Sequence, residues 1–303
     1  MQENRWCIRV LRSEGEKFRK ELLLKGILDR SAKIRSDGEY LLIPLISQIE
    51  GAWNERFECN LSKEGLPRFE HIGGIAIMRE DNPGKAAAIL EQRTGLHTVL
   101  FPVSAVNGLY RTKKFKVLAG KDTTATVAIE YGHRFFIDLS SAYFSARLSE
   151  ERQRVLNHMK EGETVIDMFA GVGPFAITLA EKARIVYACD INPEAVSLMI
   201  KNISANHTTN IVPILADAVN LPSIINLKAD RIIMNLPMSP SPFMDAAFKM
   251  VRIGGMIHLY SLVSNEEEYI VLLKKYHTVS INTRYVRSYS PDRFHVVYEV
   301  VKG

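Results

Sequence analysis

The stretch that decides the fold is ETVIDMFAGVGPFAITLAEKARIVYACDINPEAV, residues 163–196. Its hydrophobic pattern predicts a strand ending at Asp167, a glycine-rich turn, a helix from Phe175 and a second apolar strand ending at Asp190. Strands and helices continue to alternate toward the C-terminus, which predicts a parallel sheet covered by helices on both faces, with the last strand antiparallel. We therefore expect an α/β, Rossmann-like domain.

The turn between the two strands indicates a nucleotide-type ligand. Gly171 and Gly173 let the backbone approach a ligand closely, and about twenty residues separate them from Asp190, which can accept hydrogen bonds from a ribose diol. Pro174 follows the second glycine and the third glycine of the dinucleotide motif is missing. An adenosyl ligand such as S-adenosylmethionine therefore fits this turn better than NAD.

Four consecutive predicted strands end in polar groups or in the glycine turn. Ligands of such sheets bind beyond the carboxyl ends of the strands. We expect Asp190 to hold the ribose, Asp217 to accept from an adenine amino group and Asn235 to face the methyl-donor end. The full set predicted to bind the cofactor is Asp167, Phe169, Gly171, Gly173, Asp190, Ile191, Asp217, Ala218 and Asn235.

Composition narrows the functional class only slightly. The 303 residues are 47% hydrophobic and carry a net charge of +5, which suits either a polyanionic partner or a slightly basic soluble protein. The cysteines, Cys7, Cys59 and Cys189, are odd in number and contain no CxxC pair, so neither a disulfide framework nor a metal site is expected. No apolar run is long enough for a membrane helix and no signal peptide is recognisable, so we expect a cytoplasmic protein.

We expect three domains: two small α+β domains at 1–62 and 66–142, and the Rossmann-like domain at 143–303. The middle domain contains NGLYRTKKFK, residues 107–116, in which Lys and Arg alternate with the aromatic residues Tyr110 and Phe115. Such a segment suits contact with a nucleic-acid backbone, and a solvated loop is the alternative.

The apolar run 232–234 leads into Asn235-Leu236-Pro237. A proline-stiffened turn at this strand end could hold a planar nitrogen in line with a methyl donor. The alternative is an ordinary proline at the exit of a strand.

Several stretches together resemble one family. They are CIRV with EGEKFRKELL, RFEHIGGIAI, GLYRTKKFKVLAG, FIDLSSAYFSARLSEER, DMFAGVGPF, YACDINPEAV, PILADA, RIIMNLP, GGMIHLY and SYSPDRFHVV. The chain resembles the archaeal and eukaryotic tRNA (guanine-N1)-methyltransferases that act on the guanosine 3′ of the anticodon, position 37. The resemblance implies an S-adenosylmethionine-dependent enzyme, a tRNA partner, and an N-terminal domain that inspects the tRNA body.

The resemblance also implies catalytic roles. Arg111 would hold the guanine O6, where negative charge grows. Glu151 would be the general base that removes the N1 proton. Asn235 and Pro237 would position the base, and Tyr143 would shape the pocket. Without the resemblance, Glu151 reads as one member of a solvated ion pair on a helix, and Tyr143 as a core aromatic residue.

Two residues depart from the family pattern: Ala146 replaces a loop proline, and Met238 replaces a polar or cationic residue. They leave open a wyosine-pathway enzyme that transfers a methyl or an aminocarboxypropyl group to a modified guanosine at the same position. A non-catalytic tRNA-binding protein is a further alternative. We expect a monomer.

Overall fold

The structure is a computed structural model, and it describes residues 2–58, 66–105, 108–290 and 292–303. The chain divides into two compact units, Met1–Arg68 with Gly84–Thr94, and Phe69–Pro83 with Gly95–Gly303. Cys59, Asn107 and residues 63–65, between the first two expected domains, lie outside the described residues. The division into three domains stays a prediction. Among the described residues no helix is long and apolar enough to span a membrane.

The first unit is a small antiparallel sheet with one helix. Its sheet has the order β2-β3-β1-β4, and apolar side chains of β1, β3 and α1, including Val10, Leu22 and Ile43, form its core. The elements are β1 (Gln2–Leu11), α1 (Gly15–Leu24), β2 (Arg35–Asp37), β3 (Tyr40–Leu45) and β4 (Trp53–Glu58). Helix α2 (Pro83–Gln92) is amphipathic and buries Ala86 and Ile89.

The second unit begins with a four-stranded sheet and a separate hairpin. The sheet has the order β5-β6-β7-β8, formed by β5 (Phe69–Ile72), β6 (Ile75–Met78), β7 (Thr98–Pro102) and β8 (Phe115–Gly120). The hairpin is β9 (Ala125–Glu130) with β10 (His133–Asp138). The glycine pair Gly73-Gly74 forms the turn between β5 and β6. A Cβ on Gly73 would lie 2.3 Å from the carbonyl oxygen of Val127, so only glycine allows β9 to pack this closely.

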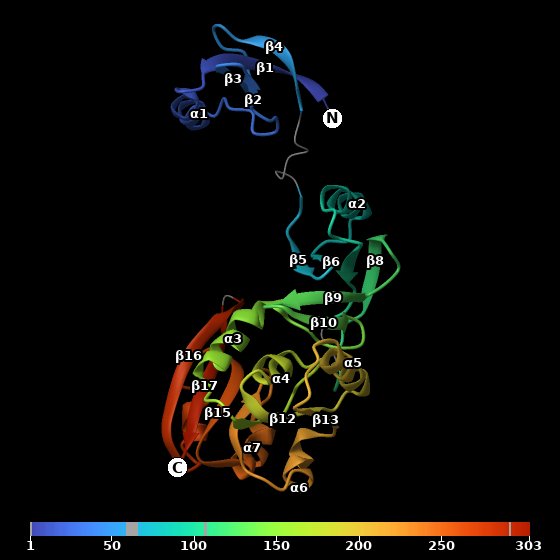
Figure 1. The fold of residues 1–303 in the computed structure, drawn as a ribbon, viewed down its shortest axis with the longest axis vertical. Helices are drawn as coiled ribbons and strands as arrows, with labels where there is room; N and C mark the ends of the chain where they lie inside the picture. The colour runs from blue at the N-terminus through green and yellow to red at the C-terminus, as the bar shows by residue number, and fades with distance from the viewer. Residues whose placement is uncertain (1, 59–65, 106–107, 291) are drawn as a thin grey trace. The chain divides into compact units, whose positions relative to one another are not determined.

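The seven-stranded sheet has the order β13-β12-β11-β14-β15-β17-β16, and its last strand, β17, runs antiparallel to β15 (Figure 1). This confirms the predicted Rossmann-like fold. The strands are β11 (Glu163–Asp167), β12 (Ala183–Asp190), β13 (Ile211–Leu215), β14 (Ala229–Met234), β15 (Val251–Val263), β16 (Thr278–Ser290) and β17 (Arg293–Lys302). The helices are α3 (Ser149–His158), α4 (Pro174–Leu179), α5 (Pro193–Ala205), α6 (Leu221–Ile224), α7 (Met244–Met250) and α8 (Ile270–Leu273).

Alternate residues of the strands enter two separate cores, because successive side chains of a strand point to opposite faces. Val165 of β11 belongs to the core formed with α3, α4 and α5, whereas the next residue, Ile166, belongs to the core formed with α6, α7 and α8. The first core also contains Ile75 and Phe135 from the smaller sheets.

Asn202 of α5 and Asn206, directly after α5, fix the hairpin to this layer. Asn202 is fully buried and bonds both the N–H and the carbonyl of Phe136, and Asn206 bonds Arg134 in the same way. The side-chain amides thus pair the exposed edge of β10 as a neighbouring strand would.

Candidate active site

The glycine turn closes against the end of β12. Gly171 and Gly173 both have positive φ, 56° and 90°, and a Cβ on Gly173 would lie only 3.0 Å from Met199 Cγ. The Gly171 N–H donates to Asp190 Oδ2 over 2.7 Å. The structure therefore brings together the turn and the acid that the sequence predicted to share a ligand.

Two carboxyl groups lie at this edge of the sheet: Asp167 is buried and Asp190 is partly buried. Burial raises the pKa of Asp190, although the backbone N–H groups of Asn192 and Gly171 oppose the shift. Burial likewise raises the pKa of Asp167 to about 7, and the charge of Asp190 adds to the effect. Asp167 Oδ2 is buried and has no hydrogen-bond partner within the part of the chain that the structure describes. Such an unpaired acceptor suits a ligand rich in hydrogen-bond donors.

The remaining predicted cofactor residues lie at the ends of neighbouring strands. Strands β13, β12, β11 and β14 are adjacent and parallel, so Asp217, Asp190, the glycine turn and Asn235 share one edge of the sheet. Asp217 caps the helical turn that begins at Ala218 by accepting from the Val219 N–H. Ile191 directly follows β12.

Phe169 lies close to this edge, at the end of β11. Its ring meets that of Phe243 edge-on, with centroids 4.9 Å apart, and its N–H donates to Asp167 Oδ1 over 3.3 Å. An aromatic wall next to the buried carboxyl groups suits a planar adenine ring.

Glu151 lies on α3 and is buried. Its carboxylate accepts two hydrogen bonds from Arg154, at 2.7 and 2.8 Å, and a third from the Tyr260 hydroxyl at 2.8 Å. Burial, followed by the charge of Glu151, raises the pKa of Tyr260 well above its ordinary value, so this hydroxyl stays protonated and donates. Without the family resemblance, Glu151 was read as part of a solvated ion pair. The pair exists, with Arg154, but it is largely buried, so the prediction that it is solvated is wrong. Arg147, four residues before Glu151, pairs with Glu70.

Arg111 and Tyr143 are in contact. The Arg111 guanidinium carbon lies 5.5 Å from the centroid of the Tyr143 ring, the geometry of a cation–π pair. Tyr143 is 45% exposed, so it is not a core aromatic residue. Its carbonyl oxygen lies 3.6 Å from the position that a Cβ on Gly171 would take, which places this pair beside the glycine turn.

His295 of β17 links the two predicted catalytic charges. Burial lowers the pKa of His295 to about 4; the positive charges of Arg287 and Arg111 lower it further, and the negative charge of Glu151 opposes them. The charges of Arg111 and Glu151, forty residues apart in sequence, thus have opposite effects on the pKa of this imidazole. The His295 ring lies 5.7 Å from that of Tyr260, and its Nε2 is buried without a hydrogen-bond partner among the described residues.

The predicted positioning turn lies next to these groups. The Pro237 carbonyl accepts from the Leu262 N–H over 2.9 Å, which fixes the turn to β15 two residues beyond Tyr260. Met238 is 56% exposed directly after it.

Sequence reasoning missed Tyr260, Glu299, His258 and His295, and considered Arg154 only as an ion-pair partner. Polar residues at inward positions of apolar strands were the available signal. GGMIHLY and RFHVVYEV each place such groups between buried aliphatic residues.

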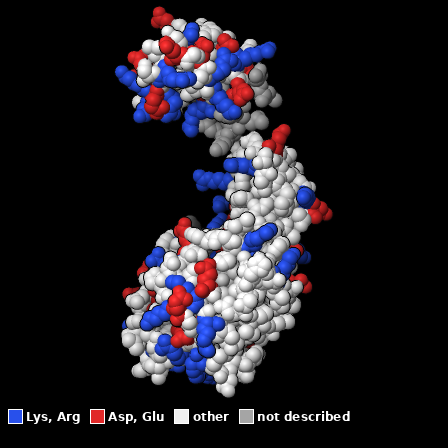
Figure 2. Space-filling model, viewed as in Figure 1, with Lys and Arg blue, Asp and Glu red and all other residues white. Residues whose placement is uncertain are grey.

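The basic segment is partly exposed. Tyr110, Lys114 and Lys116 are accessible, and Lys116 pairs with Asp81 at 2.8 Å. Figure 2 shows Lys and Arg side chains projecting from the surface in the region where Figure 1 places β5, β6 and β8. This exposure agrees with a nucleic-acid contact and also with a solvated loop. Among the described residues no group of three or more His, Cys, Asp or Glu is arranged to hold a metal ion.

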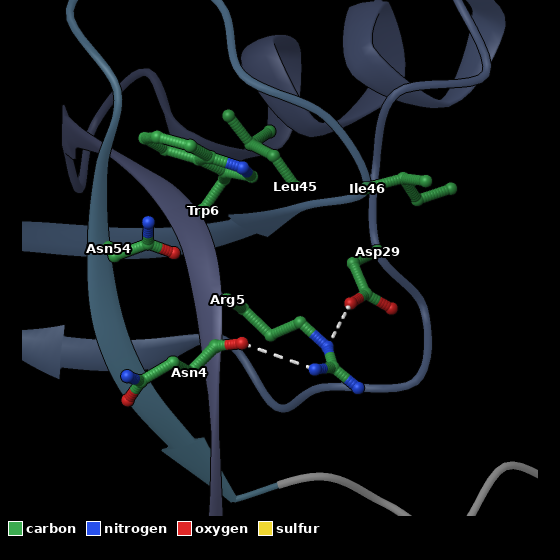
Figure 3. Close-up of a pocket in the computed structure, with 7 residues that line it drawn as sticks. All are labelled: Asn4, Arg5, Trp6, Asp29, Leu45, Ile46 and Asn54. Carbon is green, nitrogen blue, oxygen red and sulfur yellow. Dashed lines mark hydrogen bonds and ion pairs between the residues drawn. The ribbon is translucent and has the colours of Figure 1, made fainter.

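A pocket of about 340 Å³ lies in the first unit and contains none of the predicted site residues. Figure 3 shows Arg5 pointing toward Asp29, to which its Nε donates over 2.9 Å. The pocket is lined by Asn4, Arg5, Trp6, Asp29, Leu45, Ile46 and Asn54. Because Arg5 is already paired with Asp29 and Glu3, its charge is compensated inside the unit.

Comparison with known proteins gives two family matches. The TRM5/TYW2 methyltransferase domain matches residues 126–285, and the tRNA methyltransferase 5 N-terminal domain matches residues 7–53. The tRNA (guanine(37)-N(1))-methyltransferase Trm5b of Pyrococcus abyssi is 35% identical over 97% of this chain and 98% of its own length.

Two further similar proteins bear on the question of which substrate the chain uses. The tRNA 4-demethylwyosine(37)-methyltransferase Taw21 of Saccharolobus solfataricus is 38% identical over 77% of this chain and 93% of its own length. The solved complex of aTrm5 and tRNALeu superposes with a TM-score of 0.76 at 28% identity, and covers 98% of this chain and 99% of that one.

Proposed function

The chain belongs to the TRM5/TYW2 methyltransferase family, and from that premise we propose that it transfers the methyl group of S-adenosylmethionine to N1 of guanosine 37 in tRNA. The observation that supports this reaction best is the chain of contacts that runs from Glu151 through Tyr260 and His295 to Leu262, which bonds the Pro237 carbonyl. Arg111 lies against Tyr143, next to the glycine turn. The reaction needs one group to stabilise O6 and another to remove the N1 proton, and these two charges are available together.

The residues at the sheet edge fit the cofactor, which supplies an electrophilic methyl group when bound. Asp190 is partly buried and already oriented by two backbone N–H groups, so it can accept from the ribose diol. Asp167 offers an unpaired buried oxygen to a donor or a cation. Asp217 and Ala218 follow the next strand, where they can meet the adenine.

The target base would lie between Glu151, Arg111 and the Asn235–Pro237 turn. Guanine N1 carries a proton at neutral pH, so it must lose that proton as it attacks the methyl carbon. The Glu151 carboxylate accepts the proton, and Arg111 stabilises the charge that grows on O6. Asn235 and Pro237 hold the ring in line.

A wyosine-pathway substrate is the second candidate. It is favoured by the 38% identity to Taw21 and left open by the departures at Ala146 and Met238. A non-catalytic tRNA-binding protein is disfavoured by the buried acceptors at the strand ends. The expected monomeric state and cytoplasmic location remain proposals.

The deciding experiment uses labelled S-adenosylmethionine and unmodified tRNA transcripts carrying G37 or A37, followed by nucleoside analysis. We expect 1-methylguanosine from the G37 transcript and no product from the A37 transcript. Activity confined to tRNA that already carries a wyosine precursor, or an aminocarboxypropyl product, would establish the second candidate instead. No product with either substrate, together with tRNA binding, would indicate a non-catalytic protein.

A further inference from the structure

Arg154 is shared by two carboxylates. Its Nε and Nη2 donate to Glu151 on the same helix, and its Nη1 donates to Glu299 Oε1 of β17 over 2.7 Å. The side chains of Arg154, Glu151 and Glu299 are 13%, 6% and 19% exposed, respectively, so solvent screens the charges of this cluster little. Two negative charges thus flank one positive charge at the proposed general base.

Glu299 keeps its charge under all ordinary conditions. His258 and Arg154 hold the pKa of the Glu299 carboxyl at about 2, although burial opposes them. His258 is fully buried, and its Nδ1 lies 3.4 Å from Glu299 Oε1. Its Nε2 faces Arg231, which is itself paired with Glu163. Glu299 is therefore hydrogen-bonded to Arg154 and faces His258. Among the described residues His258 Nδ1 has no hydrogen-bond partner, and burial lowers the pKa of His258.

Proton transfer to Glu151 changes this cluster in one specific way. In the proposed reaction the N1–H bond of guanine would break and its proton would move to a Glu151 oxygen. The N1 electron pair would bond the methyl carbon while the carbon–sulfur bond of the donor would break, with its electron pair kept by sulfur to give S-adenosylhomocysteine. Glu151 is then neutral. If Arg154 had no other partner, it would become a buried unpaired cation, which is strongly unfavourable. Glu299 remains ionised and keeps Arg154 paired.

We propose that Glu299 is a positioning residue that enables Glu151 to accept the guanine N1 proton, by holding Arg154 when the Glu151 charge disappears. This inference rests on the proposed function of Glu151. Without the Glu299 charge, Arg154 would depend on Glu151 alone and would hold it in the ionised form, which makes it a weaker base.

The other ionisable groups around Glu151 do not replace Glu299. Tyr260 stays protonated and donates to Glu151. His295 is neutral at ordinary pH, since its pKa is about 4. Arg287 and Arg111 are cations on the His295 side and are not hydrogen-bonded to Glu151 in the contacts described.

The same helix provides a matched control. Arg152, two residues before Arg154, is paired with Glu130 of β9 through its Nε and Nη2, and the two side chains are 2% and 8% exposed. Loss of the Glu130 charge disturbs an ion pair that is buried at least as deeply, but it leaves Glu151, Arg154 and Glu299 in place.

The test is the single-turnover methylation rate at saturating tRNA and cofactor, measured against pH for Glu299→Gln, Glu130→Gln and wild type. For Glu299→Gln we expect the plateau to fall at least about tenfold and the midpoint of the ascending limb to move about one pH unit lower. For Glu130→Gln we expect a lower melting temperature with the midpoint unmoved. Deprotonation of guanine itself is common to all variants.

A double variant keeps the test decisive if Glu299→Gln alone folds poorly. In Arg154→Met/Glu299→Gln the cation that favours the ionised form of Glu151 is itself removed. We therefore expect the ascending limb of the pH–rate profile to lie at higher pH than in wild type. The inference is overturned if the limb of Glu299→Gln matches that of Glu130→Gln, or if the double variant has its limb below wild type. A wild-type rate in Glu151→Gln would instead overturn the proposed base, which distinguishes the two failures.

Discussion

The cofactor half and the chemical half of the site are built differently. The proposed cofactor half consists of strand ends, in which Asp167, the glycine turn and Asp190 lie within twenty-four residues and Gly171 of the turn donates to Asp190. The chemical half takes Arg111 from a loop, Glu151 from α3, and Tyr260, His295 and Glu299 from β15 and β17. The first half follows from one local βαβ unit, whereas the second exists only when distant segments have packed.

This difference separates binding from chemistry. Changes in the strand-end half should weaken cofactor binding and leave the chemical step nearly intact. Changes in the assembled half should do the reverse. If one of the following predictions failed, the proposed separation between residues for cofactor binding and residues for the chemical step would be wrong.

The largest expected effect is that of Glu151→Gln. Glutamine keeps the shape of the side chain but cannot accept the N1 proton, so we expect the single-turnover rate to fall about 10²- to 10⁴-fold. Affinity for S-adenosylhomocysteine, measured by calorimetry, should change by less than about threefold, because Glu151 does not line the strand ends. Glu150→Gln, at the exposed neighbouring position, is the control and should retain the wild-type rate.

Arg111→Ala should reduce the rate at saturating tRNA about 10²- to 10³-fold, the usual cost of losing one group that stabilises developing charge. Lys114→Ala removes an exposed cation three residues away. We expect that control to weaken tRNA binding and to lower its salt dependence, with the saturated rate unchanged. If Arg111→Ala behaved as Lys114→Ala should, Arg111 would be a phosphate contact rather than part of the chemistry.

The sequence alone predicted that the residues of the strand-end half lie at one edge of the sheet, because their sequence signals are local. A glycine turn, a following helix and an acid about twenty residues later appear in one window, and parallel neighbouring strands must end at one edge. The sequence also predicted that the last strand is antiparallel, which the structure confirms.

The chemical half could not be derived this way. Arg111 and Glu151 came from family resemblance, and their environment was not predictable. Tyr260 and Glu299 lie more than one hundred residues beyond Glu151, and only packing brings them to it. A polar residue in an apolar strand signals a buried partner but does not say which one.

A smaller effect is expected from Asp190→Ala. This change removes a partly buried acceptor that we expect to bind the ribose, and a charge-assisted hydrogen bond contributes about 1.5–3 kcal/mol. Affinity for S-adenosylhomocysteine should therefore fall roughly 10- to 100-fold, while the rate at saturating cofactor stays within about threefold of wild type. Asp230→Asn, which breaks a pair with Arg252 near the opposite ends of the strands, should lower stability without changing that affinity.

The smallest effect concerns the pH dependence of stability without cofactor. The pKa of Asp167 is raised from 3.8 to about 7 in the folded protein, so protonated Asp167 is favoured in the folded state. Stability from this group is complete below about pH 4 and is lost as pH rises through about 7, because the unfolded chain ionises first. In Asp167→Asn this titration is absent. The melting temperature of wild type minus that of Asp167→Asn should therefore fall by a few degrees between pH 5 and 8, which corresponds to about 2 kcal/mol. Parallel curves for the two proteins would show that Asp167 is already ionised in the folded state, and that the cofactor meets a carboxylate rather than a carboxylic acid.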